Sequence, residues 1–348
     1  MGKKLRFWLG AMILATMAYM FLSSPEMVSE AVLSGLQVSA SAILTSLFPF
    51  FVLSELWVRL GYAHRVGATL SPLIERLFHL PGNASSALLL GCIGGYPVGA
   101  RTVAQLYETG QLSRRQAEQA LLFCNNAGPA FVLGVMGAGV FRSVSAGLLL
   151  YGIHVFSALS IGVIFRPKEK VHSTIQEAPS DDPFSQAVTT SIARGGETAI
   201  RVCTFVLFFS VLIGCLQSLL PDSFGISVLL GSLELAGGAK ILSALPCSPS
   251  LRFALASLLL GWGGLCVMMQ SLSLLQTVGL DGKNLFIGKL FHGILGAILA
   301  FILAPILPLS VSCGVTSVPI LPLLGQQWMI FCLFSIPLAV FLKKTTGK

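Results

Sequence analysis

Long apolar runs recur along this chain, and they limit the class of fold that it can adopt. Runs of 17 or more apolar residues appear repeatedly. Each is long enough to cross a hydrocarbon core of about 30 Å as a helix. The 348 residues are 54% hydrophobic and only 10% charged, whereas a soluble domain carries about a quarter charged residues. The sequence therefore predicts an all-α polytopic membrane protein.

Eight segments are predicted to span the membrane, and two further apolar segments are interrupted by glycine. Residues 83–109 and 224–246 hold these interruptions, which predict two re-entrant helical hairpins with tips at Gly94–Pro97 and Ala236–Gly238. Residues 64–80 are amphipathic and too polar to cross, so we expect a helix that lies along the interface. The predicted spans are 5–23, 31–60, 113–140, 143–165, 187–220, 250–276, 285–307 and 326–342.

Basic residues predict which side of the membrane each loop faces. With the N-terminus inside, eight crossings place 16 basic residues, Lys289 among them, on the cytoplasmic side. Only Arg142 and Arg252 fall outside, provided that each glycine-interrupted segment enters and leaves on one side. Both termini are therefore predicted to be cytoplasmic, in a bacterial cell membrane. The net charge of +8 comes mostly from these loops, so the bilayer rather than nucleic acid is the expected partner.

The N-terminus and the cysteines add two smaller predictions. The basic start and long apolar run at 1–24 lack a small-x-small cleavage site, which predicts an uncleaved first helix. The eight cysteines form no CxxC and lie mostly in apolar segments. We interpret them as buried thiols and predict neither disulfides nor a metal site, and no cofactor.

The two halves of the chain resemble each other. Three matches occur in the same order at offsets of 136 to 139 residues. Each copy has three crossings, an odd number, so the second copy is predicted to be inverted relative to the first. The matches pair GYPVGAR (95–101) with ELAGGAK (234–240), NNAGPAFVLG (125–134) with GWGGLCVMMQ (261–270), and YGIHVFSALSIGV (151–163) with KLFHGILGAILAF (289–301), which aligns His154 with His292.

This repeat sets the predicted domain organisation. A polar stretch separates the two copies, and one helix lies outside them at each end. The predicted segments are an N-terminal helix and loop (1–30), the first repeat (31–166), a cytoplasmic linker (167–184), the second, inverted repeat (185–307) and a C-terminal loop and helix (308–348).

Inverted repeats with broken helices are typical of secondary transporters, whose substrate binds at mid-membrane between the broken ends. Half-helix N-termini present free N–H groups and the positive end of the helix dipole to anionic ligand groups. The alternative is that the glycines only allow close helix packing. Packing explains the break at 125–129 poorly, because two amides and a proline interrupt an apolar helix there.

The same motifs resemble those of a known family. GGYPVGAR followed by LLFCNNAGPAFVLG is similar to the nucleoside-recognition, or Gate-domain, family. GSLELAGGAK and LLLGWGGLCVMMQ narrow the resemblance to YlbJ-like sporulation integral membrane proteins, over roughly 30–342. The resemblance implies a fold similar to concentrative nucleoside transporters and a role in endospore formation, moving dipicolinate across a forespore membrane. The second break, 261–264, is largely apolar, which counts against a nucleoside substrate.

Candidate site residues cluster at the hairpin tips and the breaks. Arg101 and Lys240 occupy equivalent repeat positions, so two cations facing one cavity would suit a small dianion. The alternative is that both side chains snorkel to water. The predicted substrate-binding residues are Arg101, Lys240, Asn125, Asn126, Tyr96, Gly95, Pro97, Gly128, Gly238, Gly263 and Gly264, with Glu234 and Gln270 as coupling or charge-pair candidates.

Several of these residues have a structural interpretation as well. Glu234 is expected to pair with Lys240, or else to bind a coupling proton or cation. Asn125 and Asn126 contact the ligand or cap the first half-helix, and Tyr96 stacks on a ligand ring or anchors the hairpin tip.

For three further sets of polar residues, a structural role is preferred to a functional one. His154 and His292 are interpreted as packing histidines, with a proton relay as the alternative. Glu197 and Arg201 are predicted to pair at i,i+4. Glu55 is expected to face water at the end of its span.

The favoured function is secondary transport of a small organic anion, such as dipicolinate, across a bacterial membrane. The alternatives are a transporter of nucleosides or related solutes and a non-transporting sporulation scaffold. HExxH, GxSxG and P-loop motifs are absent, so neither an enzyme nor ATP-driven transport within this chain is predicted. The sequence leaves open the substrate, the direction, the coupling ion (H⁺ or Na⁺), the oligomeric state and any partner ATPase.

Overall fold

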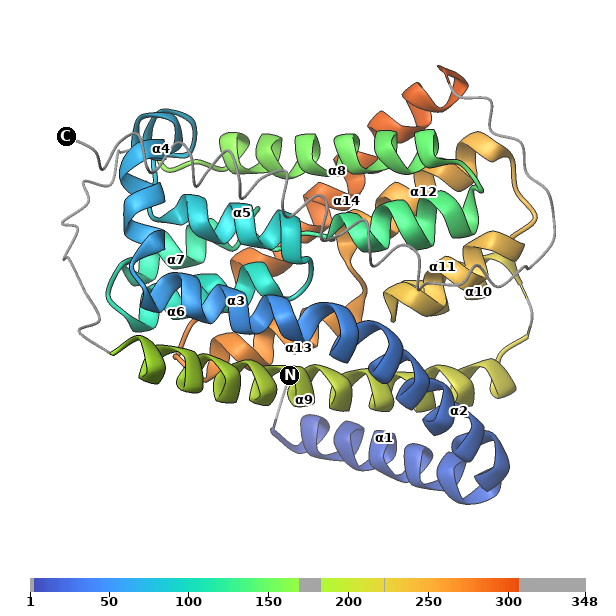
Figure 1. Ribbon diagram of the computed structural model, residues 1–348. Helices are drawn as coiled ribbons and strands as arrows, with labels where there is room; N and C mark the ends of the chain where they lie inside the picture. The colour runs from blue at the N-terminus through green and yellow to red at the C-terminus, as the bar shows by residue number, and fades with distance from the viewer. Residues whose placement is uncertain (1–2, 169–182, 222, 307–348) are drawn as a thin grey trace.

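A computed structural model describes residues 3–168, 183–221 and 223–306, and within these ranges every regular element is helical (Figure 1). The all-α prediction is therefore confirmed for the described part. The predicted span 326–342 and most of the predicted linker 167–184 lie outside the described residues.

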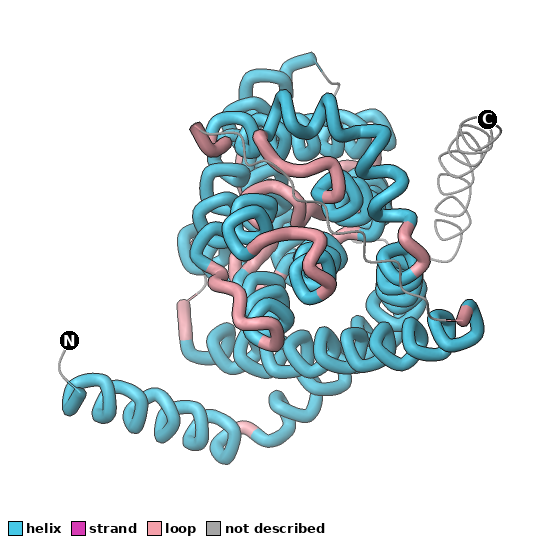
Figure 2. The backbone as a smooth tube through the Cα atoms, turned by 90° about the vertical axis from the view of Figure 1, so that its left-hand side faces the viewer, coloured by secondary structure: helices cyan, strands magenta, loops and turns pink. Residues whose placement is uncertain are grey.

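The N-terminal part of the chain forms a separate first helix, followed by one longer continuous helix. The first helix points away from the rest of the protein, as Figure 2 shows, and carries exposed apolar side chains such as Phe7, Trp8 and Leu14. The next three elements run on as one helix whose middle part is π-helical. The bounds are α1 (Lys3–Ser23), α2 (Pro25–Val38), η1 (Ser39–Leu47), α3 (Phe48–Arg59) and the amphipathic α4 (Tyr62–Phe78).

The first hairpin consists of α5 (Ala84–Gly94) and α6 (Val98–Glu108). Its turn lies within the predicted tip, and Gly95 has a φ of +83°, a conformation that side-chain-bearing residues rarely adopt. The helices α5 and α6 pack against each other, and α4 packs on α5. The glycine-rich sequence therefore turns the chain back within one short apolar segment.

The predicted span 113–140 is interrupted, as expected, but the break begins at residue 121, earlier than the predicted 125. It comprises α7 (Arg114–Ala120), eight non-helical residues at 121–128, and the π-helical η2 (Ala130–Val140). A side-chain cap at Ser113 starts α7, and Pro129 provides no N–H for a helix to continue through it. The stacked rings of Phe78 on α4 and Phe123 in the break lie 4.5 Å apart. After the break, α8 (Val144–Ile164) completes this half.

The second half begins with the long α9 (Phe184–Leu219), followed by a hairpin of α10 (Phe224–Gly231) and α11 (Leu235–Ala244). The predicted tip at 236–238 is wrong, because those residues lie inside α11. The turn lies at 232–234 instead. Glu234 accepts hydrogen bonds from the N–H groups of the first turn of α11, so the helix restarts immediately after it.

The second broken helix consists of α12 (Pro249–Trp262) and α13 (Leu265–Gln276), followed by α14 (Lys283–Leu303) and a short 3₁₀ turn, η3 (Ala304–Ile306). Gly263 and Gly264 have φ of +83° and +86°, which end α12 at the predicted place. Each half thus contains a hairpin, a broken helix and a long helix in the same order.

Long-range packing joins the two halves. α14 lies between α12 and α8, and α9 lies along α2 and α3. In Figure 1, α8 and α9 lie at opposite faces of the helical body. Five helical stretches of the described chain are long and apolar enough to cross a membrane, which agrees with a multi-pass membrane protein. They are Pro25–Arg59, Val144–Ile164, Phe184–Leu219, Pro249–Gln276 and Lys283–Leu303.

Candidate functional site

The turn of the first hairpin rests on the first break. Gly99 on α6 lies so close to the break that a Cβ there would be 2.0 Å from the carbonyl oxygen of Cys124. Gly95 and Gly128, both predicted site residues, are in backbone contact, since a Cβ on Gly95 would lie 2.8 Å from the nitrogen of Gly128. Backbone therefore packs on backbone, and the unwound residues are held by protein.

The two asparagines of the break satisfy polar groups around it. Asn125 donates from Nδ2 to the Ser271 hydroxyl of α13 at 3.0 Å and accepts from the Ala100 N–H of α6 at 3.3 Å. Asn126 donates from Nδ2 to the Phe123 carbonyl at 2.8 Å, which lies within the break, beyond the end of α7. Its Oδ1 is buried without a hydrogen-bond partner among the described residues.

Tyr96 reaches from the first hairpin to the second break. Its hydroxyl donates to the Leu260 carbonyl of α12 at 2.6 Å. A Cβ on Gly263 would lie 3.3 Å from the Tyr96 ring. The tip of the first hairpin thus contacts the first break through Gly95 and the second break through Tyr96.

The basic side chain at this junction is that of Lys289, which is among the basic residues predicted on the cytoplasmic side. Lys289 is only 1% exposed on α14, so its side chain is buried within the protein and does not face water in a loop. Its Nζ donates to the Asn125 carbonyl at 2.7 Å, lies 3.1 Å from Nδ1 of His292, and sits 4.8 Å from the centroid of the Tyr96 ring. No carboxylate in the described chain lies within 4.0 Å of Nζ.

His154 and His292, aligned by the repeat, lie together in the structure. Their ring centroids are 4.3 Å apart. Nε2 of His292 is 2.9 Å from the His154 carbonyl, and Nε2 of His154 accepts from the Ala127 N–H at 2.9 Å. Nδ1 of His154 has no partner among the described residues. We call Tyr96, Asn125, His154, Lys289 and His292 the Lys289 cluster.

The second hairpin rests on the second break in a similar way. The N–H groups of Leu265 and Cys266, at the start of α13, donate to the carbonyls of Ser232 and Leu233 in the hairpin turn, at 3.1 and 2.8 Å. The half-helix N-terminus is therefore already occupied by protein acceptors in this conformation.

Glu234 is predicted to pair with Lys240, and this prediction is wrong. Its carboxylate accepts from the Ala236 and Gly237 N–H groups at 2.9 and 2.6 Å. Lys240 is exposed, and Gln270 is buried and donates to the Cys266 sulfur at 3.1 Å.

An apolar groove of about 260 Å³ lies beside the second hairpin. Its walls are leucine-rich and come from both hairpin helices, from α12 and from Leu290 of α14. Gly238, a predicted site residue, is part of this wall and packs closely on Gly231.

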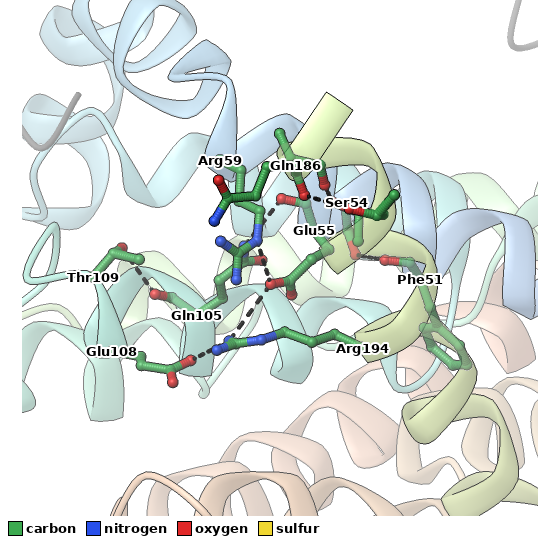
Figure 3. A network of polar contacts seen from close by, with 12 residues as sticks. Phe51, Ser54, Glu55, Arg59, Gln105, Glu108, Thr109, Gln186 and Arg194 are labelled. Carbon is green, nitrogen blue, oxygen red and sulfur yellow. Dashed lines mark hydrogen bonds and ion pairs between the residues drawn. The ribbon is translucent and has the colours of Figure 1, made fainter. Parts of the chain in front are cut away.

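Arg101 lies in a different cluster. Its Nη2 is 2.7 Å from Oε2 of Glu55, which is 1% exposed, so the expectation that Glu55 faces water is wrong. Glu55 also contacts Arg59 at 3.1 Å and Arg194 at 3.6 Å (Figure 3). Arg194 in turn contacts Glu108 at 3.1 Å. These five residues, the Glu55 cluster, join α3, α6 and α9.

Two other expectations about charged residues are corrected. Glu197 and Arg201, both described, form no ion pair; Arg201 donates to the Ser273 carbonyl of α13 at 3.2 Å. Arg252 was placed outside, yet it is 4% exposed and donates to the Leu245 carbonyl at 2.6 Å. A long-range partner thus replaces the predicted local one for Arg201, whereas Arg252 bonds to a carbonyl in the loop just before its own helix.

Lys289 is a candidate site residue that the sequence patterns do not point to. A lysine near the start of a predicted span is interpreted as a loop charge, because composition does not show in which direction a side chain points. The available signal was its spacing from His292, since residues i and i+3 share one helix face. His292 in turn matched His154 across the repeat.

Comparison with known proteins finds similarity to a nucleoside-recognition family and to a sporulation membrane protein. Residues 40–164 match the Gate family, described as nucleoside recognition, and the match ends at the last residue of α8. The chain is 29% identical to the sporulation integral membrane protein YlbJ of Bacillus subtilis (strain 168), over 81% of this chain and 79% of that protein. No solved structure matches. The resemblance is confirmed: residues 40–164 match the Gate nucleoside-recognition family, and over most of its length the chain is similar to this sporulation membrane protein.

Proposed function

We propose that this protein is a secondary transporter of a small organic anion across a bacterial membrane. The proposal includes two re-entrant hairpins and two broken helices in an inverted repeat, with eight spans and both termini in the cytoplasm. Non-helical backbone at membrane depth is tolerated only where protein or a water-filled cavity satisfies it, and such breaks surround transporter substrate sites.

The observation that carries the proposal is the Lys289 cluster. A buried ammonium without a carboxylate partner is costly inside a membrane, and intramembrane cations are usually functional. Lys289 lies where the first break, the hairpin turn and α14 meet. An anionic substrate would supply the missing counter-charge at this point.

Lys289 is a better anion anchor than the half-helix N-termini in the described conformation. The first N–H groups of α13 already bond to the second hairpin, and the Ala127 N–H bonds to His154. The protein is closed around Lys289, so substrate entry requires a hairpin to move. Arg101 and Lys240 remain candidates for a second anion contact, in a conformation where Arg101 leaves Glu55.

Dipicolinate is the first substrate to test. It carries two carboxylates on an aromatic ring, and the cluster offers a cation beside the rings of Tyr96 and His292. The similarity to a sporulation membrane protein supports a role during endospore formation. We propose a forespore membrane as its location and no enzymatic activity.

The Gate match supports a second candidate, transport of a nucleoside or related solute. Asn126, with an unpartnered Oδ1, is the residue in the first break that would serve such a ligand. A site of this kind depends more on Asn125 and Asn126 than on Lys289, so the two candidates make different mutational predictions.

Uptake of labelled dipicolinate, simple dicarboxylates and nucleosides into proteoliposomes tests the proposal. Lys289→Gln should lose at least tenfold in anion affinity, because a hydrogen bond to a charged group contributes about 1.5–3 kcal/mol. Arg115→Gln, at an exposed position on α7, is the control and should behave as wild type. Nucleoside uptake without anion uptake would favour the second candidate, and no uptake of any solute would refute transport.

A further inference from the structure

We propose that the ion coupled to transport is a proton, and that the Lys289–His292 pair holds it. This inference rests on the transport function proposed above and names its coupling ion. It starts from hydrogen-bond directions inside the Lys289 cluster, which restrict where a proton can be stored.

The His154 carbonyl fixes the tautomer of His292. A carbonyl oxygen only accepts hydrogen bonds, so Nε2 of His292, 2.9 Å away, carries the hydrogen. In the neutral ring Nδ1 then presents a lone pair, and Nζ of Lys289 lies 3.1 Å from it. Lys289 therefore donates to His292 and, with a second hydrogen, to the Asn125 carbonyl.

Around the cluster, no other side chain offers Lys289 an acceptor like Nδ1 of His292. Nε2 of His154 is occupied by the Ala127 N–H, and the Tyr96 hydroxyl donates to the Leu260 carbonyl. Besides these, the titratable groups on the elements that pack against α14 or close the cluster are Tyr151 on α8, Arg252 on α12, Arg114, Arg115 and Glu118 on α7, Cys124 in the break and Cys92 on α5. None of them pairs with Lys289 as an ion.

The lack of a carboxylate makes the charge of Lys289 depend on the substrate. A buried ammonium is disfavoured when it stands alone, and an anion beside it stabilises it. The empty site therefore favours a neutral amine, and the occupied site favours the ammonium. Proton binding and anion binding strengthen each other by the same factor, which is the requirement for coupling.

The cluster is unsuited to Na⁺. Transporter Na⁺ sites use the carbonyl oxygens of unwound backbone, and here the Asn125 carbonyl is bonded to Lys289 and the His154 carbonyl to His292. In the described chain, no group of three or more His, Cys, Asp or Glu side chains is placed to hold a metal ion. A sodium ion would also have to sit beside a lysine that becomes positively charged.

The resulting cycle is balanced in protons and charge. Water on the substrate side gives one proton to the Lys289 amine, and the anion binds to the ammonium that forms. After the site opens to the other side, the anion leaves and Nζ returns the proton to water there. One proton thus accompanies each anion, so a dicarboxylate with two charges moves one net negative charge.

The test uses proteoliposomes loaded with a pH-sensitive dye, with labelled dipicolinate as the probe. Wild-type protein should acidify the lumen when dipicolinate is added outside, and an outside-acid gradient should raise its accumulation at least tenfold. An inside-positive potential should speed uptake, and a Na⁺ gradient should have no effect. Uptake without proton entry, or uptake driven by Na⁺, would overturn the inference while leaving the transport function intact.

Lys289→Arg is the matched variant, because arginine keeps the charge but does not release a proton in proteins. It should still exchange labelled for unlabelled dipicolinate, while accumulation driven by the pH gradient falls at least tenfold. His292→Asn should weaken the response to the pH gradient, and Arg115→Gln should leave it unchanged. Gradient-driven accumulation by Lys289→Arg at the wild-type level would refute proton storage on Lys289. If wild-type protein exchanges no solute at all, the transport function itself is refuted.

Discussion

The Glu55 cluster provides the sharpest stability prediction, through the substitution Glu55→Gln. The Glu55 carboxylate is 1% exposed and lies within 4.0 Å of three arginines from three helices. Glutamine keeps the size of the side chain but removes its charge. The arginines would then face each other without the carboxylate that holds α6 against α3 and α9.

The expected magnitude follows from the burial of each partner. Breaking a buried ion pair by removing one member costs about 3–5 kcal/mol. The side chains of Arg59, Arg101 and Arg194 are 17%, 11% and 37% exposed, so they can turn partly toward water. Arg194 also keeps Glu108 as a partner. We therefore expect Glu55→Gln to lower the free energy of unfolding by about 3 kcal/mol, the lower end of this range.

Thermal unfolding of the purified protein in detergent measures this effect. Each kcal/mol lowers Tm by about 2–4 °C in domains of 150–250 residues. Taking the smaller value for this longer chain, Glu55→Gln should lower Tm by about 6 °C. Glu118→Gln is the matched control, because Glu118 forms an ion pair at 2.9 Å with Arg114, whose side chain is 59% exposed. Such exposed pairs contribute about 0–1 kcal/mol, so the control should lose less than about 2 °C.

A double-mutant cycle separates the pair from its surroundings. Arg101→Gln leaves Glu55 with two arginines, so adding it to Glu55→Gln should cost less than the sum of the two single changes. Equal Tm values for Glu55→Gln and Glu118→Gln, or strict additivity in the cycle, would refute the stabilising role of this buried carboxylate.

Four further predictions follow from the candidate site and the topology. Tyr96→Phe leaves a buried carbonyl of α12 unpaired, so it should cost about 1–3 kcal/mol in chemical unfolding; an unchanged midpoint would show that the bond does not contribute. Gly263→Ala forces a side chain into a positive φ against the Tyr96 ring and should lower Tm by several degrees; a rise in Tm would contradict the strain. If Arg101 and Lys240 contact the anion, the double change to glutamine should raise the apparent substrate constant at least tenfold, whereas unchanged transport would exclude them from the site. Cysteine labelling at position 175 should occur only from the cytoplasmic side, and labelling only from outside would reject the predicted orientation.

The sequence by itself determined the class of the protein and most of the places where its helices break. Apolar runs without charge require helices in a membrane, since every backbone polar group must be paired there. The breaks at Gly95, at Pro129 and at Gly263–Gly264 follow from local backbone chemistry, which needs no knowledge of the rest of the fold. The match of His154 with His292 also came from sequence alone, and the structure brings the two rings into contact.

Only the tertiary structure decided which charges are buried and which partners they have. Arg101 and Lys240 looked alike in sequence, yet one is held by Glu55, 46 residues away, and the other is exposed. Lys289 looked like a loop charge but lies against the first break and the turn of the first hairpin. The cost of burying a charge depends on what surrounds it after packing, and those neighbours come from distant parts of the chain. Local sequence therefore predicts where the backbone bends, while long-range packing assigns each charged side chain its environment.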